Sequence, residues 1–537
     1  MQGTFFFITL LIPLYQGAFL KRQKRELLAN PPEETCSPLK NHVSFSSVKV
    51  SIGTPPQAFQ LVADTGSNDL IVVDCTCRDC PRDWGSCFTG PKRSTSFDMT
   101  VYKNGNTSRT ANFARKEQQG PLAMVISFGS GQVAAEIASD EVRVGSTHSY
   151  MKNGLLLLVD HSLNLPGPFE GILGLGRPQP KEDGKYVEMT SARGVAVPGF
   201  FEAARVQRFS MCFNRMEDGV LGVHTPQQPT MLKSVGKVHW GLDFRGITVG
   251  KNLAIKAAFC DASQKPAGME TVCGLIPDSG TTLITGPTSM LITLFEEICQ
   301  NWPRCRAAHE ELKKEVKEMP EMRLEGLSLL GRPKSEAAPD EIIRIMNKIR
   351  DIMEKADKAS AAYPTGPPRE QVSSGPMMSD TLQLLLESCA SWIEGVDLND
   401  EMPKLTFHVA GANGVETDLV LPPRTYVLSE QSVDGRKVCI PAFSPNEMKT
   451  TLNGDVWIMG TPLFYEYTAH YDRGLGNQEA SMAFTPNADE ACGQCKDDVI
   501  VKKSSLITSS ARRTGFEGLQ FLTQKPVMRN LTNLESI

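Results

Sequence analysis

The chain has 537 residues, of which 40% are hydrophobic and 22% charged, a composition typical of globular proteins and unlike that of disordered or collagen-like chains. Its formal net charge is −5, so charge indicates neither a nucleic-acid partner nor an anionic membrane. A chain of this length can bury a large core, and its 14 cysteines therefore indicate an oxidising compartment rather than a substitute for that core.

The N-terminus has the features of a secretory leader. Residues 5–14 (FFFITLLIPL) form an apolar run with the length of a signal-peptide core, shorter than the ~20 residues that span a bilayer. The basic segment KRQKR at 21–25 offers a processing site. We expect a signal peptide over 1–20 and a short pro-segment or linker over 21–41. A buried first strand is the alternative for the apolar run.

Strand and turn patterns dominate residues 43 to about 144. Residues 47–52 alternate with a period of two and stop at a Gly-Thr-Pro-Pro turn. Residues 59–63 predict a further strand. Residues 123–128 and 133–144 flank a Gly-Ser-Gly tip, which predicts a β-hairpin.

A charged segment follows later in the chain. In residues 306–360, 24 of 55 side chains are Asp, Glu, Lys or Arg, and apolar residues recur at helical spacing between Ile342 and Ala356. We expect a solvated helical insertion on the surface at about 301–388, and a partner-binding or regulatory helix is the alternative. Long surface loops cost little closure entropy, so we expect that deleting about 307–368 leaves the rest of the chain able to fold.

The C-terminal tail, residues 487–537, is polar and carries a Cys-Gly-Gln-Cys sequence. Outside the N-terminus no apolar run reaches 18 residues, so we expect no transmembrane anchor. The sequons at Asn106 and Asn530 agree with a secreted glycoprotein.

One short motif occurs twice. Asp64-Thr65-Gly66-Ser67 and Asp278-Ser279-Gly280-Thr281 each follow an apolar segment, and the copies lie 214 residues apart, about the size of one lobe. Glycine lets a turn approach another backbone closely, and the hydroxyl groups can donate hydrogen bonds that keep a carboxylate ionised. Two such turns that meet about a pseudo-twofold axis would place Asp64 and Asp278 side by side.

Each turn also has a later apolar partner that ends in glycine. Residues 171–174 (GILG) lie downstream of the first turn, and residues 456–460 (VWIMG) lie downstream of the second. A lone Asp-Thr-Gly is a common turn sequence. Two copies at lobe spacing, each with such a partner, indicate a functional pair of carboxylates.

These motifs resemble those of the pepsin-like aspartic proteases, in a cysteine-enriched branch. The similarity runs from about His42 to Pro486, apart from the insertion, and the stretches that carry it are 52–57, 64–67, 169–175, 278–283, 286–288 and 457–460. The resemblance implies a mostly β, bilobal fold with a cleft between the lobes and a hairpin flap over it. It also implies an N-terminal lobe over 42–225 and a C-terminal lobe over 226–486 that carries the helical insertion.

The chemistry of that family follows from two carboxylates in one site. Because like charges so close together cannot both ionise easily, one carboxyl keeps a proton while the other acts as a base. The resemblance implies that Asp64 and Asp278 activate a water that attacks the peptide carbonyl, with no metal, cofactor or covalent intermediate. A retroviral-type dimeric protease is excluded because both motifs lie in one chain.

The resemblance assigns roles to the hydroxyl residues of the two turns. Ser67 and Thr281 would support the outer carboxylate oxygens, while Thr65 and Ser279 would brace the two loops against each other. The complete set of dyad-support positions is Thr65, Gly66, Ser67, Ser279, Gly280 and Thr281.

Two positions depart from the family pattern. The hairpin tip reads Phe128-Gly129-Ser130-Gly131, with Phe128 where the family usually has Tyr. Ile71 occupies the position of the Trp that usually receives the phenolic hydrogen bond. Both partners of that hydrogen bond are therefore replaced together, and the replacements keep the wall of the cleft apolar. We place the four tip residues, Ile71 and Thr282 in the flap and substrate cleft.

The cysteines extend the resemblance. Two pairs match pairs of the family: Cys260 with Cys273, and Cys389 with Cys439. Four further cysteines resemble the cysteine-enriched loop of plant and parasite members, with zinc binding as the alternative: Cys75, Cys77, Cys80 and Cys87. Cys299 and Cys305 can pair at the root of the insertion. The insertion sits where plant members carry a saposin-like domain but lacks its six-cysteine framework, so the resemblance does not extend to the lipid binding of that domain.

The sequence therefore predicts an aspartic endopeptidase that acts as a monomer on proteins or peptides, at acidic pH, with apolar side chains flanking the cut bond. The alternative is a catalytically silent binding protein that keeps the cleft for recognition, which the altered flap favours. We expect a zymogen with a short or absent inhibitory segment. We place it in the secretory pathway, either secreted or in an acidic endolysosomal compartment.

Overall fold

The computed structural model describes residues 33–501 apart from 104–105, 109–120, 164–167, 178–180, 183–184, 187–188, 191–194, 252–258, 319–376, 432–436, 475–477, 488–491 and 497. The predicted signal peptide, the helix between Ile342 and Ala356, the sequon at Asn530 and the tail beyond residue 501 lie outside the described residues.

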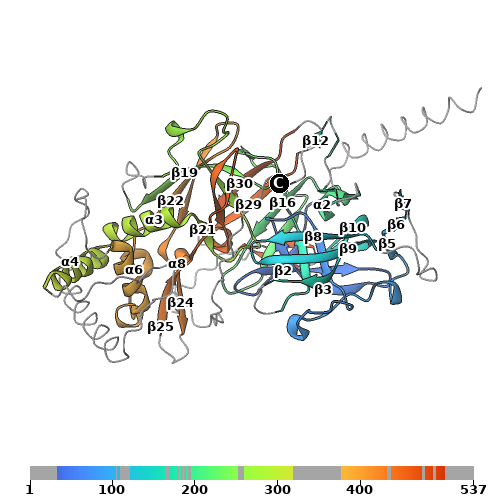
Figure 1. Ribbon diagram of the computed structural model, residues 1–537, viewed down its shortest axis with the longest axis horizontal. Helices are drawn as coiled ribbons and strands as arrows, with labels where there is room; N and C mark the ends of the chain where they lie inside the picture. The colour runs from blue at the N-terminus through green and yellow to red at the C-terminus, as the bar shows by residue number, and fades with distance from the viewer. Residues whose placement is uncertain are drawn as a thin grey trace, which may run out of the picture.

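Two large β-sheets form the molecule (Figure 1), which confirms the mostly β, two-part fold. The first is a 14-stranded sheet that takes strands from both ends of the chain. Its order is β18 (Leu232–Lys233), β30 (Ser481–Pro486), β29 (Tyr467–Asp472), β16 (Arg208–Cys212), β17 (Gly219–Val223), β1 (Thr35–Asn41), β2 (Ser46–Ile52), β3 (Gln57–Asp64), β11 (Gly171–Gly174), β4 (Leu70–Val73), β10 (Thr147–His161), β9 (Gly131–Val144) and β5 (Asp98–Met99), with β8 (Ala123–Phe128) paired to β9.

The second sheet has eight strands, which lie between residues 242 and 459. Its order is β23 (Glu416–Leu421), β22 (Leu405–Ala410), β19 (Leu242–Val249), β20 (Cys273–Pro277), β28 (Gly454–Met459), β21 (Ile284–Gly286) and β26 (Phe443–Pro445), with β27 (Lys449–Thr450) paired to β28. Two-stranded ribbons complete the strands: β6 (Val101–Lys103) with β7 (Asn106–Ser108), β12 (Lys181–Glu182) with β13 (Lys185–Tyr186), β14 (Met189–Thr190) with β15 (Ala196–Val197), β24 (Val427–Gln431) with β25 (Lys437–Pro441), and β31 (Gln494–Lys496) with β32 (Val499–Val501).

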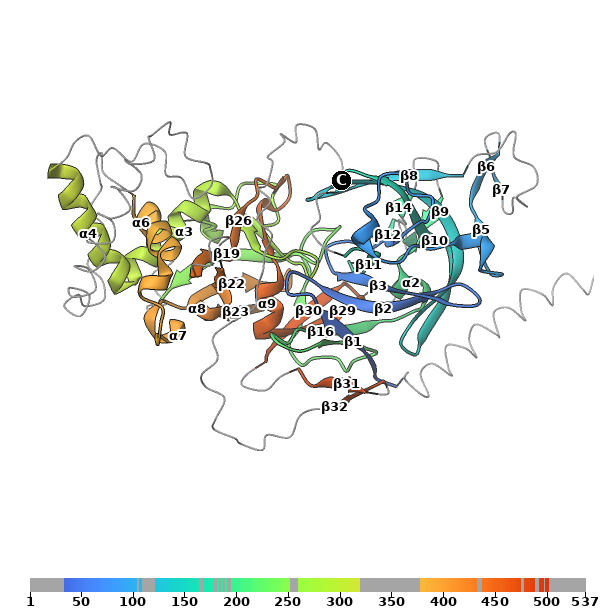
Figure 2. The ribbon, with the colours of Figure 1, turned by 90° about the horizontal axis from the view of Figure 1, so that it is seen from below.

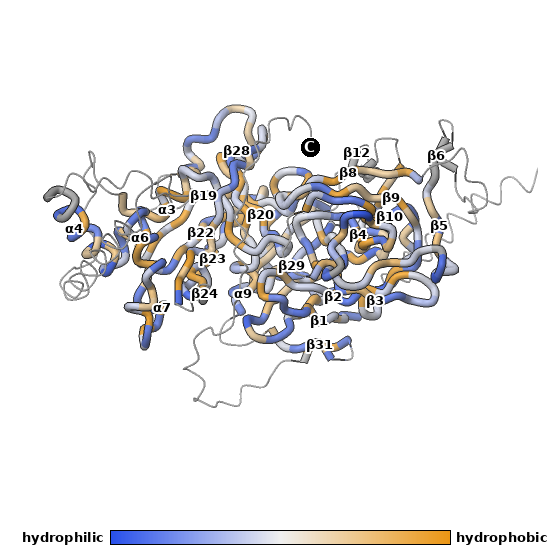
Figure 3. Tube along the Cα trace, turned by 60° about the horizontal axis from the view of Figure 1, so that its bottom comes forward, coloured by the Kyte–Doolittle hydropathy of each residue, from blue (hydrophilic) through white to orange (hydrophobic). Residues whose placement is uncertain are grey.

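The predicted strands are present, because the alternation in the sequence matches the burial of the strands. In β2 and β3 the inward-facing apolar side chains are fully buried, as at Val48, Val50 and Leu61. Figure 3 shows the same division along the chain: the strand β4 is apolar throughout, whereas hydrophilic residues dominate the short helix α7 (Leu398–Glu401).

The expected linker and lobe boundaries differ from the observed sheets at two places. Residues 35–41, expected in a linker, form β1 and pair with β17 and β2. Strands β29 and β30, expected in the C-terminal lobe, extend the first sheet beside β16. In Figures 1 and 2 these strands lie between the two halves of the molecule.

The start of the predicted tail is also ordered. The hairpin β31–β32 lies against β1 (Figure 2). Two disulfides fix it, Cys36–Cys495 and Cys212–Cys492. The Cys-Gly-Gln-Cys sequence therefore ties the tail to both β1 and β16, which the sequence did not predict.

Helices gather at the far end of the second sheet (Figure 1). They are α3 (Thr288–Asn301), α4 (Pro303–Glu318) and α6 (Met378–Glu387), which pack on one another. The shorter helical segments are α2 (Phe200–Ala203), α8 (Pro423–Tyr426), α9 (Thr461–Glu466), η1 (Arg82–Trp84), η2 (Gly90–Lys92), η3 (Ala262–Gln264) and η4 (Cys389–Ser391).

The first part of the predicted insertion is not a surface excursion. Ala307, Ala308 and Leu312 of α4 are buried in the main apolar core. His309 hydrogen-bonds through Nδ1 to the hydroxyl of Thr381 on α6 at 2.9 Å. Because α4 carries core residues, a deletion that begins at Ala307 removes part of the core, and we therefore expect it to lower stability.

All 14 cysteines form disulfides. The expected partners Cys260–Cys273, Cys389–Cys439 and Cys299–Cys305 are joined, and the bond between Cys299 and Cys305 links α3 to α4. The cysteine-enriched loop pairs as Cys75–Cys87 and Cys77–Cys80. Because a disulfide sulfur is not the thiolate that zinc requires, these pairings oppose the zinc alternative.

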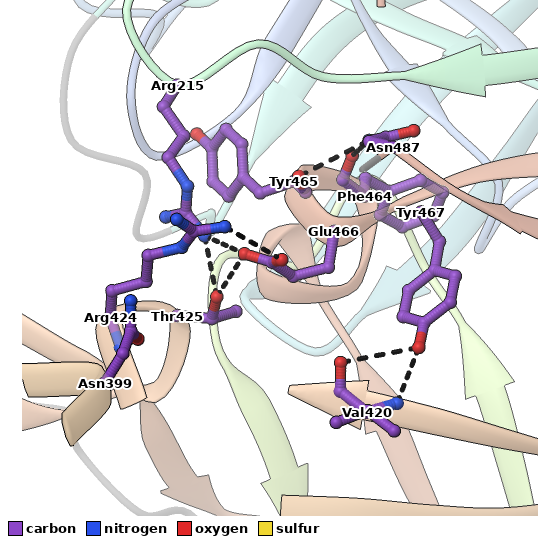
Figure 4. Close-up of polar contacts among 10 residues, drawn as sticks. All are labelled: Arg215, Asn399, Val420, Arg424, Thr425, Phe464, Tyr465, Glu466, Tyr467 and Asn487. Atoms are coloured by element: carbon purple, nitrogen blue, oxygen red, sulfur yellow. Dashed lines mark hydrogen bonds and ion pairs between the residues drawn. The ribbon is translucent and has the colours of Figure 1, made fainter. Parts of the chain in front are cut away.

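A partly buried ion pair joins the two halves (Figure 4). The Arg215 guanidinium, after β16, donates to the Glu466 carboxylate at the end of α9 and to the Thr425 hydroxyl in α8 (2.6 Å). It also lies 5.1 Å from the ring centroid of Tyr465, and Arg424 contacts the second carboxylate oxygen of Glu466 at 3.5 Å. Burial lowers the pKa of Arg215, and Glu466 opposes that shift. We call these five residues the Arg215 network.

Candidate active site

Each motif sits at the end of a buried strand in the same setting. Strand β3 ends at Asp64 and pairs in parallel with β11, and β20 ends at Pro277 and pairs in parallel with β28. The two partner sequences identified downstream of the motifs thus lie beside the strands that carry them. The amide of Leu175 donates to the carbonyl of Asp64 (2.6 Å), and the amide of Asp278 donates to the carbonyl of Met459 (2.9 Å).

Reciprocal hydrogen bonds join the two turns. The amide of Thr65 donates to Oγ of Ser279, and the amide of Ser279 donates to Oγ1 of Thr65, both at 3.0 Å. The hydroxyl groups donate onward, from Thr65 to the carbonyl of Pro277 (3.0 Å) and from Ser279 to the carbonyl of Ala63 (2.7 Å). Both side chains are fully buried. These four bonds fix the turns symmetrically.

The two carboxylates meet at the glycines of the opposite turns. A Cβ atom at Gly66 would lie 2.6 Å from Oδ2 of Asp278, and one at Gly280 would lie 2.4 Å from Oδ1 of Asp64. No real Cβ contact is that short, so both positions require glycine for this close approach. The structure therefore brings Asp64 and Asp278 together, each packed against the other's turn.

Hydrogen-bond donors surround both carboxylates. The amide of Gly66 donates to Oδ1 of Asp64 at 2.8 Å, and the hydroxyl of Ser67 donates to Oδ2. In the second turn the amide of Gly280 donates to Oδ1 of Asp278 at 2.8 Å, and the hydroxyl of Thr281 donates to Oδ2 at 2.7 Å. Each carboxylate thus receives one amide and one hydroxyl bond within its own turn.

The two carboxyl groups differ in environment. Asp64 is 7% exposed, whereas Asp278 is only half-buried. Burial, followed by the negative charge of Asp278, raises the pKa of Asp64 well above its usual range, while the bonds from Ser67 and Gly66 oppose this shift. At mildly acidic pH the pair can therefore hold one shared proton.

The hairpin β8–β9 carries the predicted flap residues. Phe128 pairs with Gly131 across a two-residue turn, and its ring packs on an apolar cluster that includes the fully buried Ile71. A Cβ at Gly131 would lie 2.3 Å from the carbonyl oxygen of Ser162, so this tip position accepts only glycine. Gly129 and Ser130 are exposed.

Thr282 is half-buried and bonds to two neighbouring segments. Its hydroxyl donates to the carbonyl of Ser44 at 2.7 Å, and its own carbonyl accepts a bond from the hydroxyl of Thr461 at 2.9 Å. Both polar groups of Thr282 thus hold the second turn to neighbouring segments.

The cysteine-enriched loop, residues 75–87, packs on the same apolar cluster as Phe128. Trp84 of this loop belongs to the same apolar cluster as Ile71 and meets Phe169 edge-on, with centroids 4.9 Å apart. The carboxylate of Glu170 anchors the loop by accepting the amide of Ser86 at 2.6 Å. The loop therefore buttresses the wall on which Phe128 packs.

Three further residues with shifted pKa values were not found from the sequence. Asp69 is 4% exposed, and burial raises its pKa to about 6. The His239 ring contacts the carbonyl of Gly66 through Nδ1 at 3.0 Å. Tyr471 of β29 is buried, stacked on Phe209 with ring centroids 4.7 Å apart. No local sequence pattern distinguishes these three residues, because their burial depends on tertiary packing.

Within the described ranges, no group of three or more His, Cys, Asp or Glu side chains could hold a metal ion. Of the helices in the described ranges, none is both long enough and apolar enough to cross a membrane.

Comparison with known proteins gives a consistent result. The family model for eukaryotic aspartyl protease matches residues 47–484. The chain is 27% identical to pregnancy-associated glycoprotein 2 of Bos taurus over 52% of this chain and 65% of the relative, and 26% identical to aspartic proteinase A1 of Arabidopsis thaliana over 48% and 46%. It is 23% identical to cyprosin of Cynara cardunculus over 81% of this chain and 89% of the relative. The first two matches thus span about half to two thirds of those relatives.

Proposed function

The chain belongs to the eukaryotic aspartyl protease family, and we propose that it is an aspartic endopeptidase in which Asp64 and Asp278 activate a water molecule. The observation that carries the proposal is the symmetric meeting of the two turns. Each carboxylate is packed against the glycine of the opposite turn and receives an amide and a hydroxyl bond from its own turn.

The two carboxyl groups act as one coupled pair that shares a single proton. The ionised carboxylate takes a proton from the water as the water oxygen bonds to the carbonyl carbon, and the protonated carboxyl gives its proton to the carbonyl oxygen. The gem-diol then collapses: the carbon–nitrogen bond breaks, a proton passes to the amine nitrogen, and a carboxylic acid and an amine leave.

The surroundings support a preference for apolar side chains beside the cut bond. Phe128, at the hairpin tip, is half-buried and packs on an apolar cluster that contains Ile71. Ile71 is fully buried, so it supports this apolar wall from within and does not line the cleft as expected. Burying one apolar side chain is worth roughly 1.5–3 kcal/mol. The seven disulfides favour action in the secretory pathway, and the shared proton favours an acidic compartment or medium.

The direct test is cleavage of a denatured protein by the mature chain between pH 3 and pH 8. We expect cleavage in acid, with apolar residues at the sites that mass spectrometry identifies. Asp64→Asn and Asp278→Asn should each remove it, while Glu394→Gln, at an exposed position, should not. Unchanged cleavage in either Asn variant would contradict the assignment. A folded parent chain that binds peptides without cutting them would favour the silent binding protein.

A further inference from the structure

His239 lies at the meeting point of the two carboxylate turns. It precedes Trp240, which is fully buried and donates from its indole nitrogen to the carbonyl of Leu175 at 3.0 Å. This anchor fixes the segment that carries the imidazole. Nδ1 of His239 lies 3.0 Å from the carbonyl oxygen of Gly66. Because a carbonyl oxygen can only accept, Nδ1 carries the hydrogen in this bond.

Gly66 connects this imidazole to both carboxylates. Its amide donates to Oδ1 of Asp64 at 2.8 Å. Its α-carbon faces Asp278, since a Cβ there would lie 2.6 Å from Oδ2. The ring and Asp64 therefore both hydrogen-bond to Gly66, and the charge of Asp278 also acts on the ring.

Three other charged side chains lie on or around the segment that carries His239, and two of them bind its backbone. Glu270 accepts the amide of Gly236 at 3.1 Å, and the guanidinium of Arg177 donates to the carbonyl of the same residue. Lys237 is exposed on the segment itself. The charge that acts on the His239 ring is instead that of Asp278.

The charge on the ring depends on pH. Burial lowers the pKa of His239, while the Gly66 carbonyl and Asp278 oppose that shift. The ring is therefore neutral near pH 7 and becomes cationic in acid, where one carboxylate must stay ionised. The hydrogen bond to Gly66 is present in both states, because Nδ1 carries a hydrogen in each.

We infer that His239 is a positioning residue that holds the Asp64 turn through Gly66 and, once protonated, keeps one carboxylate of the pair ionised at lower pH than the pair would reach alone. Its effect on catalysis rests on the proposed function. The electrostatic coupling between the imidazole and the carboxylates is a property of the folded protein and can be measured without activity.

Two variants separate the hydrogen bond from the charge. His239→Asn keeps a nitrogen donor at the position of Nδ1 but cannot become cationic. His239→Leu has a similar shape and neither property. In His239→Asn we expect the maximal kcat to stay within about twofold and the acidic limb of the pH–kcat profile to rise by at least about half a pH unit, with the upper limb unchanged. In His239→Leu we expect the same shift and a roughly tenfold lower maximal kcat.

An acidic limb that does not move in His239→Asn would overturn the charge role, and this variant remains informative if His239→Leu fails to fold. A Leu variant with the maximal kcat of the parent would overturn the positioning role. We expect His239→Asn to keep the maximal kcat but to shift the acidic limb. Replacing a merely structural residue would not separate these two effects.

The activity-independent test is an NMR titration of histidine-labelled protein, with the His239 signal assigned by its loss in His239→Asn. Coupling is reciprocal, so the double variant Asp64→Asn/Asp278→Asn should lower the pKa of His239 by at least about half a unit. If the pKa of His239 shifts in the double variant but the parent protein cuts no peptide, the coupling holds and the proposed protease activity is wrong. If the pKa of His239 does not shift but the parent protein cuts peptides, the coupling is wrong and the proposed protease activity holds.

Discussion

Thr65 and Ser279 hold the two carboxylate turns together, each amide donating at 3.0 Å to the hydroxyl oxygen of the other residue. The two residues stand 214 positions apart, so this arrangement links two distant parts of the chain next to Asp64 and Asp278. The bonds join the residues that directly follow these two carboxylates, and they therefore hold the two turns together.

Removing one hydroxyl of this pair should loosen the site. Ser279→Ala leaves the buried amide of Thr65 and the carbonyl of Ala63 without their partners, which should cost about 2–4 kcal/mol of unfolding free energy. We also expect kcat to fall, because the carboxyl groups lose their fixed separation. Denaturant unfolding and peptide cleavage measure both effects. Ser279→Thr restores the hydroxyl and serves as the control; a Thr variant as impaired as the Ala variant would contradict this explanation.

The upper limb of the pH profile should depend on Ser67. Burial and Asp278 raise the pKa of Asp64, and the hydroxyl of Ser67 lowers it by bonding to the charged form. Ser67→Ala removes that opposition, so the shared proton should persist to higher pH and the upper limb of kcat should move upward. The exposed Ser289 of α3 provides the control, as Ser289→Ala. An upper limb that moves downward in Ser67→Ala would refute this account.

Asp69 should make stability depend on pH. Burial raises its pKa from 3.8 to about 6, so the folded state holds the proton more tightly than the unfolded state does. Its cost is absent below about pH 4, grows as pH rises, and reaches up to about 3 kcal/mol above pH 6. Asp69→Asn should therefore raise the melting temperature at pH 7 and leave it unchanged at pH 4. Calorimetry at the two pH values tests this, with the exposed Glu394→Gln as control. An equal change at both pH values would rule out titration as the cause.

The Arg215 network should be intolerant of losing one charge. The side chains of Arg215 and Glu466 are 21% and 13% exposed. Arg215→Met leaves the Glu466 carboxylate partly buried without this partner and should cost about 2–3 kcal/mol. Adding Glu466→Gln should recover part of that loss. Urea unfolding of the single and double variants measures the coupling.

An exposed ion pair supplies the comparison for this network. Lys449 is 68% exposed in its contact with Asp455, and Lys449→Met should cost less than about 1 kcal/mol. Equal losses for Lys449→Met and Arg215→Met would show that burial of the network has no effect.

The charged segment should be removable only within limits. Replacing residues 319–376 by a flexible Gly-Ser linker keeps α4 and α6, and we expect a folded chain with the same disulfides. Extending the deletion back to Ala307 removes the buried Leu312, which alone is worth roughly 1.5–3 kcal/mol. Melting temperatures of the two deletion proteins test the difference. Equal stability of both would show that the packing of α4 on α6 contributes nothing.

Local sequence was sufficient to predict the two carboxylate turns, because each turn is formed by residues that are neighbours in the chain. A strand that ends in Asp, a glycine turn and a hydroxyl three positions later are set by neighbouring residues, and their repetition after one lobe length predicted two equivalent turns. The same reasoning located the strands around Val48 and Leu61, since a half-buried strand must alternate with a period of two.

Distant packing decided the remaining features. The sequence around Thr35–Asn41 resembles a linker, and it becomes β1 only because β17, some 180 residues later, offers an unpaired edge. Cys492 and Cys495 have no local partner, and only the folded chain brings Cys212 and Cys36 to them. Likewise, burial of Asp69 and contact between His239 and Gly66 depend on segments far apart in the chain. Sequence periodicity and turn chemistry determined the two carboxylate turns, whereas the environments that set their protonation arise from long-range contacts, which only the tertiary structure provides.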